Sequence, residues 1–256
     1  MRPYNTYQDL KDIAEDTIRH IWENESLITE YITKMTEYYP EGNAGFDLKQ
    51  LHDPTGKLNT NAEISVEQLT SLQAIEKYPN EFCILNFASA KNPGGGFLKG
   101  ALAQEETLAR SSNLYPALVE QEKFYRNPKA PYYTDRVIYS PDVLFFKNDD
   151  GHYIEPIPCS VITCAAPNLN AEGWDLETLK ITFLERIEKV FQIAIMNNEE
   201  NLILGAWGCG VFKNPPEMVA EQFVHMLNKY KRYFTKIVFA IPDEKNFNVF
   251  NNIICQ

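Results

Sequence analysis

The sequence predicts an α/β fold with a mostly parallel central sheet, at least from Glu81 onward. Three observations support this prediction. Short apolar runs of the kind expected for strands covered on both faces recur along this part of the chain. Stretches with helical periodicity separate them, and glycine-rich loops follow two of the runs. Alternating strands and helices are typical of a parallel sheet with helices packed on its faces.

Composition indicates an ordinary globular protein. The chain has 256 residues, of which 44% are hydrophobic and 23% charged, which suits one large domain or one domain with an extension. The net charge of -11 argues against direct DNA binding or adhesion to anionic membranes, but a nucleotide can still be held by backbone N–H groups. No apolar run is long enough for a membrane span or a signal core. We expect a cytoplasmic monomer.

The cysteines and histidines do not suggest a metal site. Five cysteines, an odd number, include no C-x-x-C pair, and three of them lie in apolar runs. We interpret them as reduced thiols of an intracellular protein. The four histidines are scattered, and none has H-E-x-x-H spacing. We therefore predict no metal and no cofactor. The cysteines are Cys83, Cys159, Cys164, Cys209 and Cys255.

The chain is expected to divide into a helical N-terminal extension, residues 1–80, and a main domain, residues 81–256. Apolar residues at spacings of three and four predict amphipathic helices in the extension. Nothing in it suggests chemistry, so we interpret it as a helical cap packed on the main domain. In order, we expect helices over residues 7–24 and 27–38, a loop over 42–61, and a helix that starts at Ser65.

In the main domain, apolar runs and helical stretches alternate. A proline pair, Pro215 and Pro216, suits the first turn of the last expected helix. Strands are expected over residues 82–88, 136–139, 143–146, 159–166, 202–206 and 237–241, and helices over 101–126, 176–197 and 215–234.

Two glycine-rich loops follow strands of this predicted sheet, at whose carboxyl ends ligands usually bind. The first loop holds three adjacent glycines, which allow close approach of the backbone to a ligand. The second offers a backbone nest for a diphosphate and an aromatic ring for a sugar or base. A single G-x-G is more often only a turn, but two loops at two strand ends together predict a site. The residues are Gly94, Gly95 and Gly96 in the first loop, and Gly208, Cys209, Gly210, Val211 and Phe212 in the second.

A polar triplet, Gln104, Glu105 and Glu106, begins a helix seven residues after the glycines. Acids also favour a first helical turn for dipole reasons alone, which is the alternative interpretation. Hydrolysis of a glycosidic bond needs a proton donor and an activated water. Neighbouring helical residues diverge by roughly 100°, so the two acids would have distinct roles, one at the scissile bond and one at a ribose hydroxyl. Burial near Phe97 and Leu98 would raise a carboxyl pKa, and Gln104 would orient either acid.

Cys209 is an alternative nucleophile in the second loop. No histidine lies near it in the sequence, and a small residue between two glycines needs no catalytic explanation. Catalysis by Cys209 is therefore disfavoured.

The glycine triplet followed after seven residues by Gln-Glu-Glu resembles the signature of the poly(ADP-ribose) glycohydrolases, a catalytic branch of the macrodomains. The segments NFASAKNPGGGFLKGALAQEETLARSSNLY and LGAWGCGVFKNPP are similar to the shorter, bacterial-type members. The similarity runs from about Glu81 to the C-terminus, and a helical N-terminal extension also resembles microbial members. The resemblance implies a three-layer α/β/α macrodomain, with a mixed, mostly parallel sheet, that binds ADP-ribose.

The resemblance also implies roles for individual residues. Glu106 would protonate the leaving group and then activate water, while Glu105 would fix the adjacent ribose hydroxyls. The glycines and Gln104 would shape the ribose end of the pocket, and Phe212 would pack on the terminal ribose. The remaining assignments are Gly208, Cys209, Gly210 and Val211 at the diphosphate, and Asn86, Ser89 and Asn92 at the riboses. Residues 126–155 do not align, and specificity determinants are expected there.

Four functions follow from these observations. The first is a glycosidase that releases ADP-ribose from the ends of poly(ADP-ribose). The second removes single ADP-ribose units from modified proteins, the third only binds ADP-ribose, and the fourth is an unrelated nucleotide or sugar-phosphate binding protein. Paired carboxylates disfavour the noncatalytic reader, because binding a phosphorylated sugar does not need them.

Overall fold

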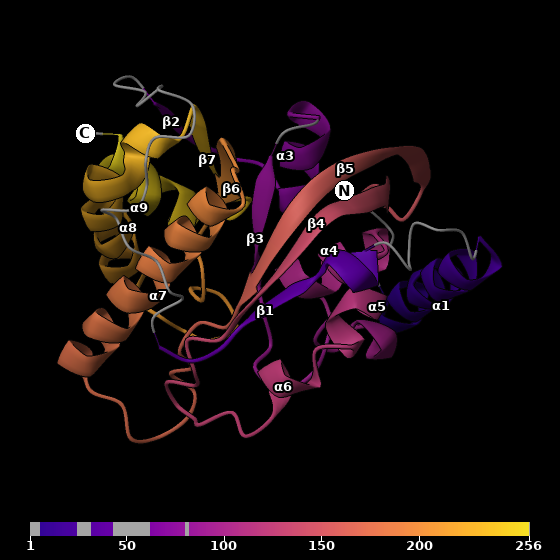
Figure 1. Cartoon of the computed structure of the whole chain (residues 1–256), viewed down its shortest axis with the longest axis horizontal. Coiled ribbons are helices and arrows are strands. Elements are labelled where there is room, and N and C mark those ends of the chain that lie inside the picture. Colours follow the sequence, from indigo (N-terminus) through magenta and orange to yellow (C-terminus); the bar gives the residue numbers. More distant parts are fainter. Residues whose placement is uncertain (1–5, 25–31, 43–61, 80–81, 256) are drawn as a thin grey trace.

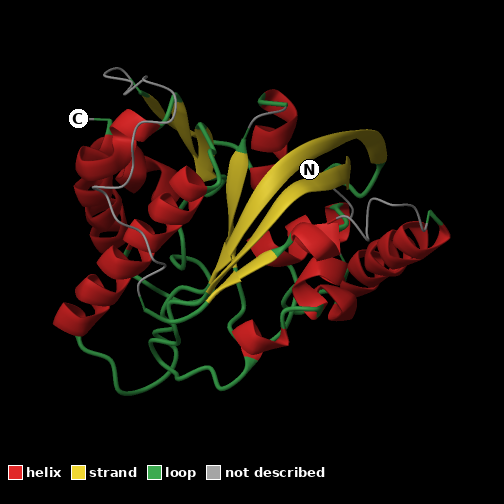
Figure 2. Ribbon diagram, in the orientation of Figure 1, coloured by secondary structure: helices red, strands yellow, loops and turns green. Residues whose placement is uncertain are grey.

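The computed structural model describes residues 6–24, 32–42, 62–79 and 82–255. In this part of the chain one seven-stranded sheet lies between two layers of helices (Figures 1 and 2). The strands are β1 (Glu37–Tyr39), β2 (Glu63–Glu67), β3 (Cys83–Phe87), β4 (Val137–Lys147), β5 (Tyr153–Cys164), β6 (Asn201–Leu204) and β7 (Lys236–Ala240). The helices are α1 (Tyr7–Glu23), α3 (Ser71–Lys77), η1 (Phe97–Lys99), α4 (Gln104–Ser111), α5 (Leu114–Val119), α6 (Glu122–Tyr125), α7 (Leu176–Met196), α8 (Pro216–Tyr230), η2 (Lys231–Tyr233) and α9 (Glu244–Ile254).

The strand order is β1-β4-β5-β3-β6-β7-β2. From β5 to β2 the neighbouring strands are parallel, whereas β4 is antiparallel to β5 and β1 is antiparallel to β4. The carboxyl ends of β3, β5, β6, β7 and β2 therefore meet at one edge of the sheet, where a ligand can reach the loops of several strands. The predicted mixed and mostly parallel α/β sheet is confirmed.

A separate hydrophobic core lies on each face of the sheet. One core joins the sheet to α7, α8 and α9 and includes Phe183, Phe191 and Phe223. The other joins it to α3, α4 and α5 and includes Leu72, Leu108 and Leu118. Parallel strands buried on both faces need such covering, which explains their nearly continuous apolar sequences. This is the predicted three-layer α/β/α arrangement, with α1 outside α4 and α5 (Figure 1).

The expectation of a mainly helical N-terminal segment is only partly right. Helix 7–24 is confirmed as α1, which Thr6 caps by accepting a hydrogen bond from the backbone N–H of Asp9. The helix expected from Ser65 is wrong, because β2 pairs there with β7, opposite Val238. The next helix, α3, begins only at Ser71, after a capping box formed by Thr70 and Gln73.

The two remaining N-terminal expectations fall partly outside the described residues. Residues 32–35 are helical, but the expected helix 27–38 ends before β1, and residues 25–31 lie outside the described part. Most of the expected loop 42–61 also lies outside it. Both edge strands of the sheet, β1 and β2, precede residue 80. The division of the chain at that residue stays a prediction.

Three expectations for the main domain need correction. The strands expected at 136–139 and 143–146 form one strand, β4, whose pairing register shifts between Ser140 and Val143. The helix expected over 101–126 is three short helices, because the chain turns at Asn113, whose side-chain oxygen accepts a hydrogen bond from Leu144 N–H at 2.9 Å. Helix α9 was not expected, although Asp243 caps it by accepting from Asn246 N–H at 2.9 Å.

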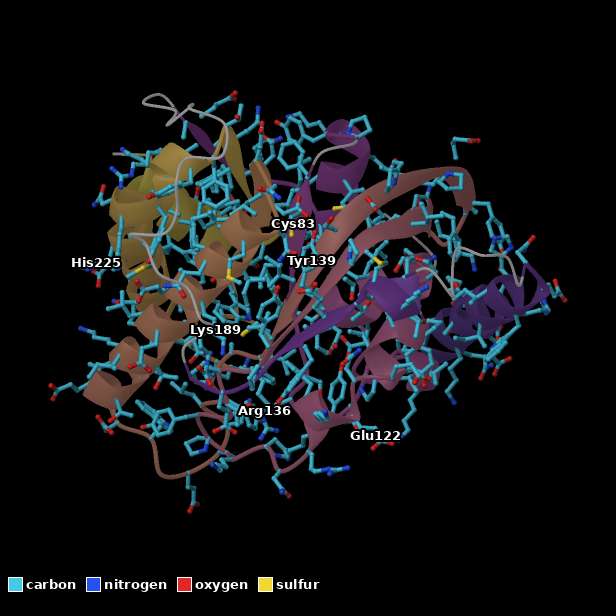
Figure 3. All side chains as sticks on the ribbon, in the orientation of Figure 1. Cys83, Glu122, Arg136, Tyr139, Lys189 and His225 are labelled. Atoms are coloured by element: carbon cyan, nitrogen blue, oxygen red, sulfur yellow. The ribbon has the colours of Figure 1, made fainter. Side chains whose placement is uncertain are left out.

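The cysteines are free thiols, as predicted. Cys83 is buried in the middle of the sheet near Tyr139 (Figure 3), and burial raises the pKa of its thiol. No helix in the described ranges is long and apolar enough to cross a membrane.

Two cations hold the turn that follows β1 (Figure 3). Lys189 from α7 donates to the carbonyl groups of Pro40 and Gly42, and Arg136 pairs with Glu41 at 2.8 Å. These contacts explain how a strand of only three residues keeps its place at the sheet edge.

A buried lysine holds α1 on the rest of the fold. The side chain of Lys147, at the end of β4, is 0% exposed. Its ammonium group donates to Asp16 at 2.7 Å and to the Thr17 hydroxyl at 2.8 Å. The hydrogen bond from Lys147 lowers the pKa of Asp16 to about 2. The ion pair between Asp16 and Lys147 thus joins helix α1 to the β4–β5 hairpin, and its lysine side chain is fully buried.

We expect Asp16→Asn to destabilise the fold by roughly 2 kcal/mol at pH 7, because Lys147 is left as an unpaired buried cation while Asp16 itself is partly solvated. The unfolding midpoint should fall by roughly 5 °C. Because the folded-state pKa of Asp16 is lowered, its contribution is present above the ordinary pKa near 3.8 and lost as the pH falls toward 2. The difference between variant and native protein should therefore shrink in acid.

Thermal unfolding at pH 7 and pH 3 measures this effect. The double variant Asp16→Asn/Lys147→Met should recover most of the loss, since it removes both charges. Equal midpoints for Asp16→Asn and the native chain at pH 7 would show that the pair does not stabilise the fold.

Candidate active site

The glycine triplet lies between the end of β3 and the start of α4. Gly94 and Gly95 have φ angles of +66° and +60°, in the left-handed region that favours glycine. A Cβ atom on Gly95 would lie 2.3 Å from Glu106 Oε1 and 3.0 Å from Glu105 Oε2. The backbone of Gly95 therefore lies directly against both carboxylates, and a side chain there would have to displace them while adopting a strained positive φ.

Glu106 is half-buried in the first turn of α4. Its Oε1 accepts a hydrogen bond from the backbone N–H of Gly96 at 2.9 Å. This bond fixes the carboxylate on the glycine loop. The other carboxylate oxygen, Oε2, is not used in this bond.

Glu105 is more deeply buried than Glu106, with 3% of its surface exposed. Its Oε2 accepts a hydrogen bond from Ser89 N–H at 2.6 Å, while its Oε1 is buried without a hydrogen-bond partner. Burial raises the pKa of Glu105 well above its usual value, and the neighbouring charge of Glu106 raises it further, against the effect of the Ser89 N–H. Burial in this setting favours the neutral, protonated form of the carboxyl group.

Glu105 is therefore the more buried of the two acids. Of the two apolar residues expected beside them, Phe97 is buried but Leu98 is 44% exposed. The difference follows from the helix geometry, which turns Glu105 toward the end of β3 and Glu106 toward the glycine loop.

Gln104 joins three elements. Its amide oxygen accepts from Phe87 N–H at 2.9 Å, and its amide nitrogen donates to the Leu85 carbonyl at 2.9 Å and to Ser71 Oγ at 3.1 Å. These bonds connect the start of α4 to β3 and α3. We expected this amide to orient one of the glutamates, but its hydrogen bonds go to the strand instead.

The polar residues after β3 differ in how they are held. Asn86 is buried and donates to Thr163 at 3.2 Å, while its side-chain oxygen has no hydrogen-bond partner. Ser89 Oγ accepts from the N–H groups of Lys91 and Asn92, so it shapes the loop locally. Asn92 is exposed, and its backbone carbonyl accepts a hydrogen bond from Gly95 N–H at 3.0 Å. The buried oxygens Asn86 Oδ1 and Glu105 Oε1 thus have no hydrogen-bond partner.

The second loop follows β6, the strand next to β3. Gly208 has a φ of +75°, and a Cβ atom there would lie 2.6 Å from the amide nitrogen of Asn214. That amide donates to the carbonyls of Pro167 and Gly208 at 2.8 and 3.0 Å. Asn214 thereby closes the loop and fixes it to the chain after β5.

The side chains of this loop include one thiol and one aromatic ring. Burial raises the pKa of Cys209, and the charge of Glu217 raises it further, so the thiol is not activated as a nucleophile. The ring of Phe212 lies 6.1 Å from that of Tyr133. Tyr133 belongs to the region in which we expected specificity determinants.

A cavity of 560 Å³ is lined by residues at the carboxyl ends of β3, β6 and β7, together with residues of α1, α3, α4 and the β4–β5 turn. Of the residues that the sequence singled out, it is lined by Gln104, Gly208, Gly210, Val211 and Phe212. The glycine triplet, both glutamates, Cys209 and the three polar residues after β3 are not part of its lining. The glutamates come directly after Gln104 in the sequence. Gln104 and Phe87, the last residue of β3, do line the cavity.

Sequence reasoning missed several residues that line this cavity. They belong to the β7–α9 loop, the first turn of α9 and the start of α3, and Arg110 of α4 lines it too. The loop after β7 follows a predicted strand, so the rule that pointed to the other two loops applied to it as well. The start of α3 had no such signal, because β2 was not recognised as a strand. These residues are Thr70, Ser71, Pro242, Asp243 and Asn246.

Within the described residues, no group of three or more His, Cys, Asp or Glu side chains is arranged to hold a metal ion. The chemistry of the site is that of two unequal carboxyl groups. Glu105 is buried, which favours its protonated form, and Glu106 accepts a single backbone N–H beside a loop without side chains. Such a pair is suited to acid and base catalysis at a sugar bond.

The sequence matches the family model of the microbial-type PARG catalytic domain over residues 16–148, more than half of the chain. PARG denotes poly(ADP-ribose) glycohydrolase. The matched region includes the glycine triplet and both glutamates. The chain belongs to this family. It is accordingly a glycosidase whose family substrate is poly(ADP-ribose).

Solved structures agree with this assignment. The poly(ADP-ribose) glycohydrolase of Thermomonospora curvata bound to the inhibitor ADP-HPD is 32% identical, with a TM-score of 0.83 over 96% of this chain and 99% of that one. The enzyme of Deinococcus radiodurans in complex with ADP-ribose is also 32% identical, with a TM-score of 0.77 over 90% and 98% of the two chains. No curated protein sequence matches the chain significantly.

We expect Gly95→Ala to reduce poly(ADP-ribose) hydrolysis by about 100-fold or more, because the added methyl group would displace both carboxylates. Gly173→Ala is a matched control, since Gly173 also has a positive φ, +86°, but no heavy atom lies within 4 Å of its Cβ position. Both variants should lose similar stability from backbone strain. ADP-ribose release and thermal unfolding are measured for both variants. A loss of activity in Gly95→Ala alone then comes from the contact with the carboxylates and not from backbone strain. Equal activity of the two variants would contradict the carboxylate contact.

Proposed function

We propose that this chain releases ADP-ribose from the ends of poly(ADP-ribose) by hydrolysing the ribose–ribose bond. The observation that carries the proposal is the contact of two unequal carboxyl groups with one glycine backbone, at the carboxyl edge of a parallel sheet. The relative from Deinococcus radiodurans in complex with ADP-ribose supports the same ligand for this chain.

In the proposed reaction, Glu106 donates a proton to the oxygen of the leaving ribose while the bond from the anomeric carbon to that oxygen breaks. The anomeric carbon develops oxocarbenium character. Glu106, now ionised, accepts a proton from the water that attacks this carbon, which restores the acid.

Glu105 has a different role in this proposal. Its buried Oε1 and the buried oxygen of Asn86 have no hydrogen-bond partner. Because Oε2 accepts from Ser89 N–H, Oε1 carries the proton of a neutral Glu105 and donates it to a hydroxyl oxygen of the terminal ribose, while a ribose hydroxyl donates to Asn86. Such a bond offsets the cost of burying an unpaired polar atom. Because burial favours the neutral form of Glu105, the pair carries less negative charge next to the anionic substrate.

The rest of ADP-ribose extends from the glutamates along the cavity. Backbone N–H groups of the Gly208 to Val211 loop suit the diphosphate, and the exposed face of Phe212 suits the ribose. The β7–α9 loop also lines the cavity, and in this proposal it contacts the adenosine. A loop against the adenosine favours a terminal unit over an internal unit of the polymer, because an internal unit continues beyond its adenosine ribose.

We expect Glu106→Gln to reduce release of ADP-ribose by roughly 10²–10⁴-fold, the range attributed to general acid–base catalysis. The carboxamide still accepts the Gly96 N–H, so the dissociation constant for ADP-ribose should stay within about threefold of the native value. Product analysis on poly(ADP-ribose) of defined length measures the first quantity, and calorimetry measures the second.

The same assay distinguishes the proposed function from the alternative functions. Chain-end action produces ADP-ribose at the earliest time points, whereas internal cleavage produces oligomers. Release from singly modified protein but not from polymer would replace the proposal with mono-ADP-ribosyl hydrolysis. Tight binding of ADP-ribose with no release from either substrate would contradict any glycosidase function.

A further inference from the structure

Helix α1 contacts the catalytic loop through one aromatic side chain. Phe97 directly follows the glycine triplet, and its ring is fully buried. It forms a small hydrophobic cluster with Ala14 of α1 and Ala109 of α4, against which Ile18 and Tyr115 pack. The rings of Phe97 and Tyr115 meet edge to face at 4.8 Å. This cluster is separate from the two large cores on the faces of the sheet.

The ring of Phe97 supports the first glycine of the triplet. A Cβ atom on Gly94 would lie 3.0 Å from Phe97 Cδ1 and 3.2 Å from Ala109 Cβ. The backbone of Gly94 is thus packed on the ring with no space to spare. Ala14 and Phe97 thus belong to one buried cluster, the Phe97 ring packs on Gly94, and the adjacent Gly95 lies against the two carboxylates.

A second contact lies at the end of the same loop. Gly100 has a φ of +80°, and a Cβ atom there would lie 2.3 Å from the carbonyl oxygen of Tyr7 in the first turn of α1. Gly100 N–H also donates to the Phe97 carbonyl at 3.1 Å. The loop is therefore bounded by α1 on both sides of η1.

Helix α1 is itself fixed to the catalytic helix. The Thr17 hydroxyl donates to the backbone carbonyl of Arg110 near the end of α4. The same hydroxyl accepts from the buried ammonium group of Lys147, which also pairs with Asp16. The two ends of the segment that carries the glycines and glutamates, residues 94–111, are thus held by one helix.

We propose that α1 is a positioning element of the active site, and that Ala14 and Phe97 are positioning residues for Glu105 and Glu106. Neither side chain touches the carboxylates. Ala14 sets the position of the Phe97 ring, and the ring sets the position of the glycine backbone on which both carboxylates lie. This inference rests on the proposed function, because it concerns the geometry of that reaction.

Small displacements at this place affect the chemical step more than binding. A shift of about 1 Å at reacting groups costs on the order of 100-fold in rate. The loops that suit the diphosphate and the adenosine follow β6 and β7 and lie outside the small cluster. Disturbing the contact of α1 with Phe97 should therefore lower kcat and leave most of the affinity for ADP-ribose.

The test is a double-mutant cycle of Ala14→Leu and Phe97→Ala, which exchanges the large and small side chains across the contact. Each single variant should lose about tenfold or more in kcat on poly(ADP-ribose), with the ADP-ribose dissociation constant within about threefold of native. The double variant should recover part of the loss, because residues in direct contact do not behave independently. Losses that multiply as for independent sites would overturn the proposal.

A control variant separates positioning from general destabilisation. Ile193 is equally buried, on α7 and across the sheet from α1. Ile193→Ala should lower the unfolding midpoint at least as much as the single variants, with kcat unchanged. If Ile193→Ala loses kcat to the same degree, the effect is general destabilisation and the proposal is wrong.

The milder pair Ala14→Val and Phe97→Leu answers the same question if the larger changes prevent folding. A folded Ala14 variant with native kcat would overturn the inference while the native chain still releases ADP-ribose. If the native chain releases none, the proposed function fails first, and the two failures are therefore distinguishable.

Discussion

The site depends on the contact between the Gly95 backbone and two carboxylates. A side chain at Gly95 would displace the carboxylates, because its Cβ position is filled by Glu106 and bordered by Glu105. For this contact to form, the end of β3 must lie next to the start of α4. Gln104 holds the two together through hydrogen bonds with Phe87 N–H and the Leu85 carbonyl. The glycine loop and the acids therefore form a single structural unit, and their spacing in the sequence follows from it.

The same contact makes two chemically similar residues different. Glu105 points toward the buried end of β3, and burial favours its neutral form. Glu106 lies on the loop and accepts one N–H. A chain with a net charge of -11 would be expected to repel a diphosphate; in the proposed function, burial that favours the neutral form of Glu105 and a loop of backbone N–H groups reduce that repulsion locally. The buried thiol of Cys209 adds no charge.

The N-terminal residues are more closely integrated with the site than their sequence indicated. Both edge strands of the sheet come from residues before 80, and α1 packs on Phe97 and Gly100. The family match begins at residue 16, inside α1. The cap interpretation accounts for the amphipathic pattern of α1, but it omits that the apolar face of this helix contacts the loop carrying the glycines.

The sequence by itself determined the strands and helices whose burial pattern is local, such as β3, α7 and α8, and it located the glycine triplet, the second loop and the paired acids. Tertiary structure alone decided the rest. The short strands β1 and β2 are stable only because β4 and β7, distant in the chain, supply their hydrogen bonds. Periodicity likewise shows that a face of α1 is buried but not that Phe97 lies beneath it. Which glutamate is buried depends on the end of β3. Each of these outcomes depends on a partner far away in the sequence, and a local pattern does not identify that partner.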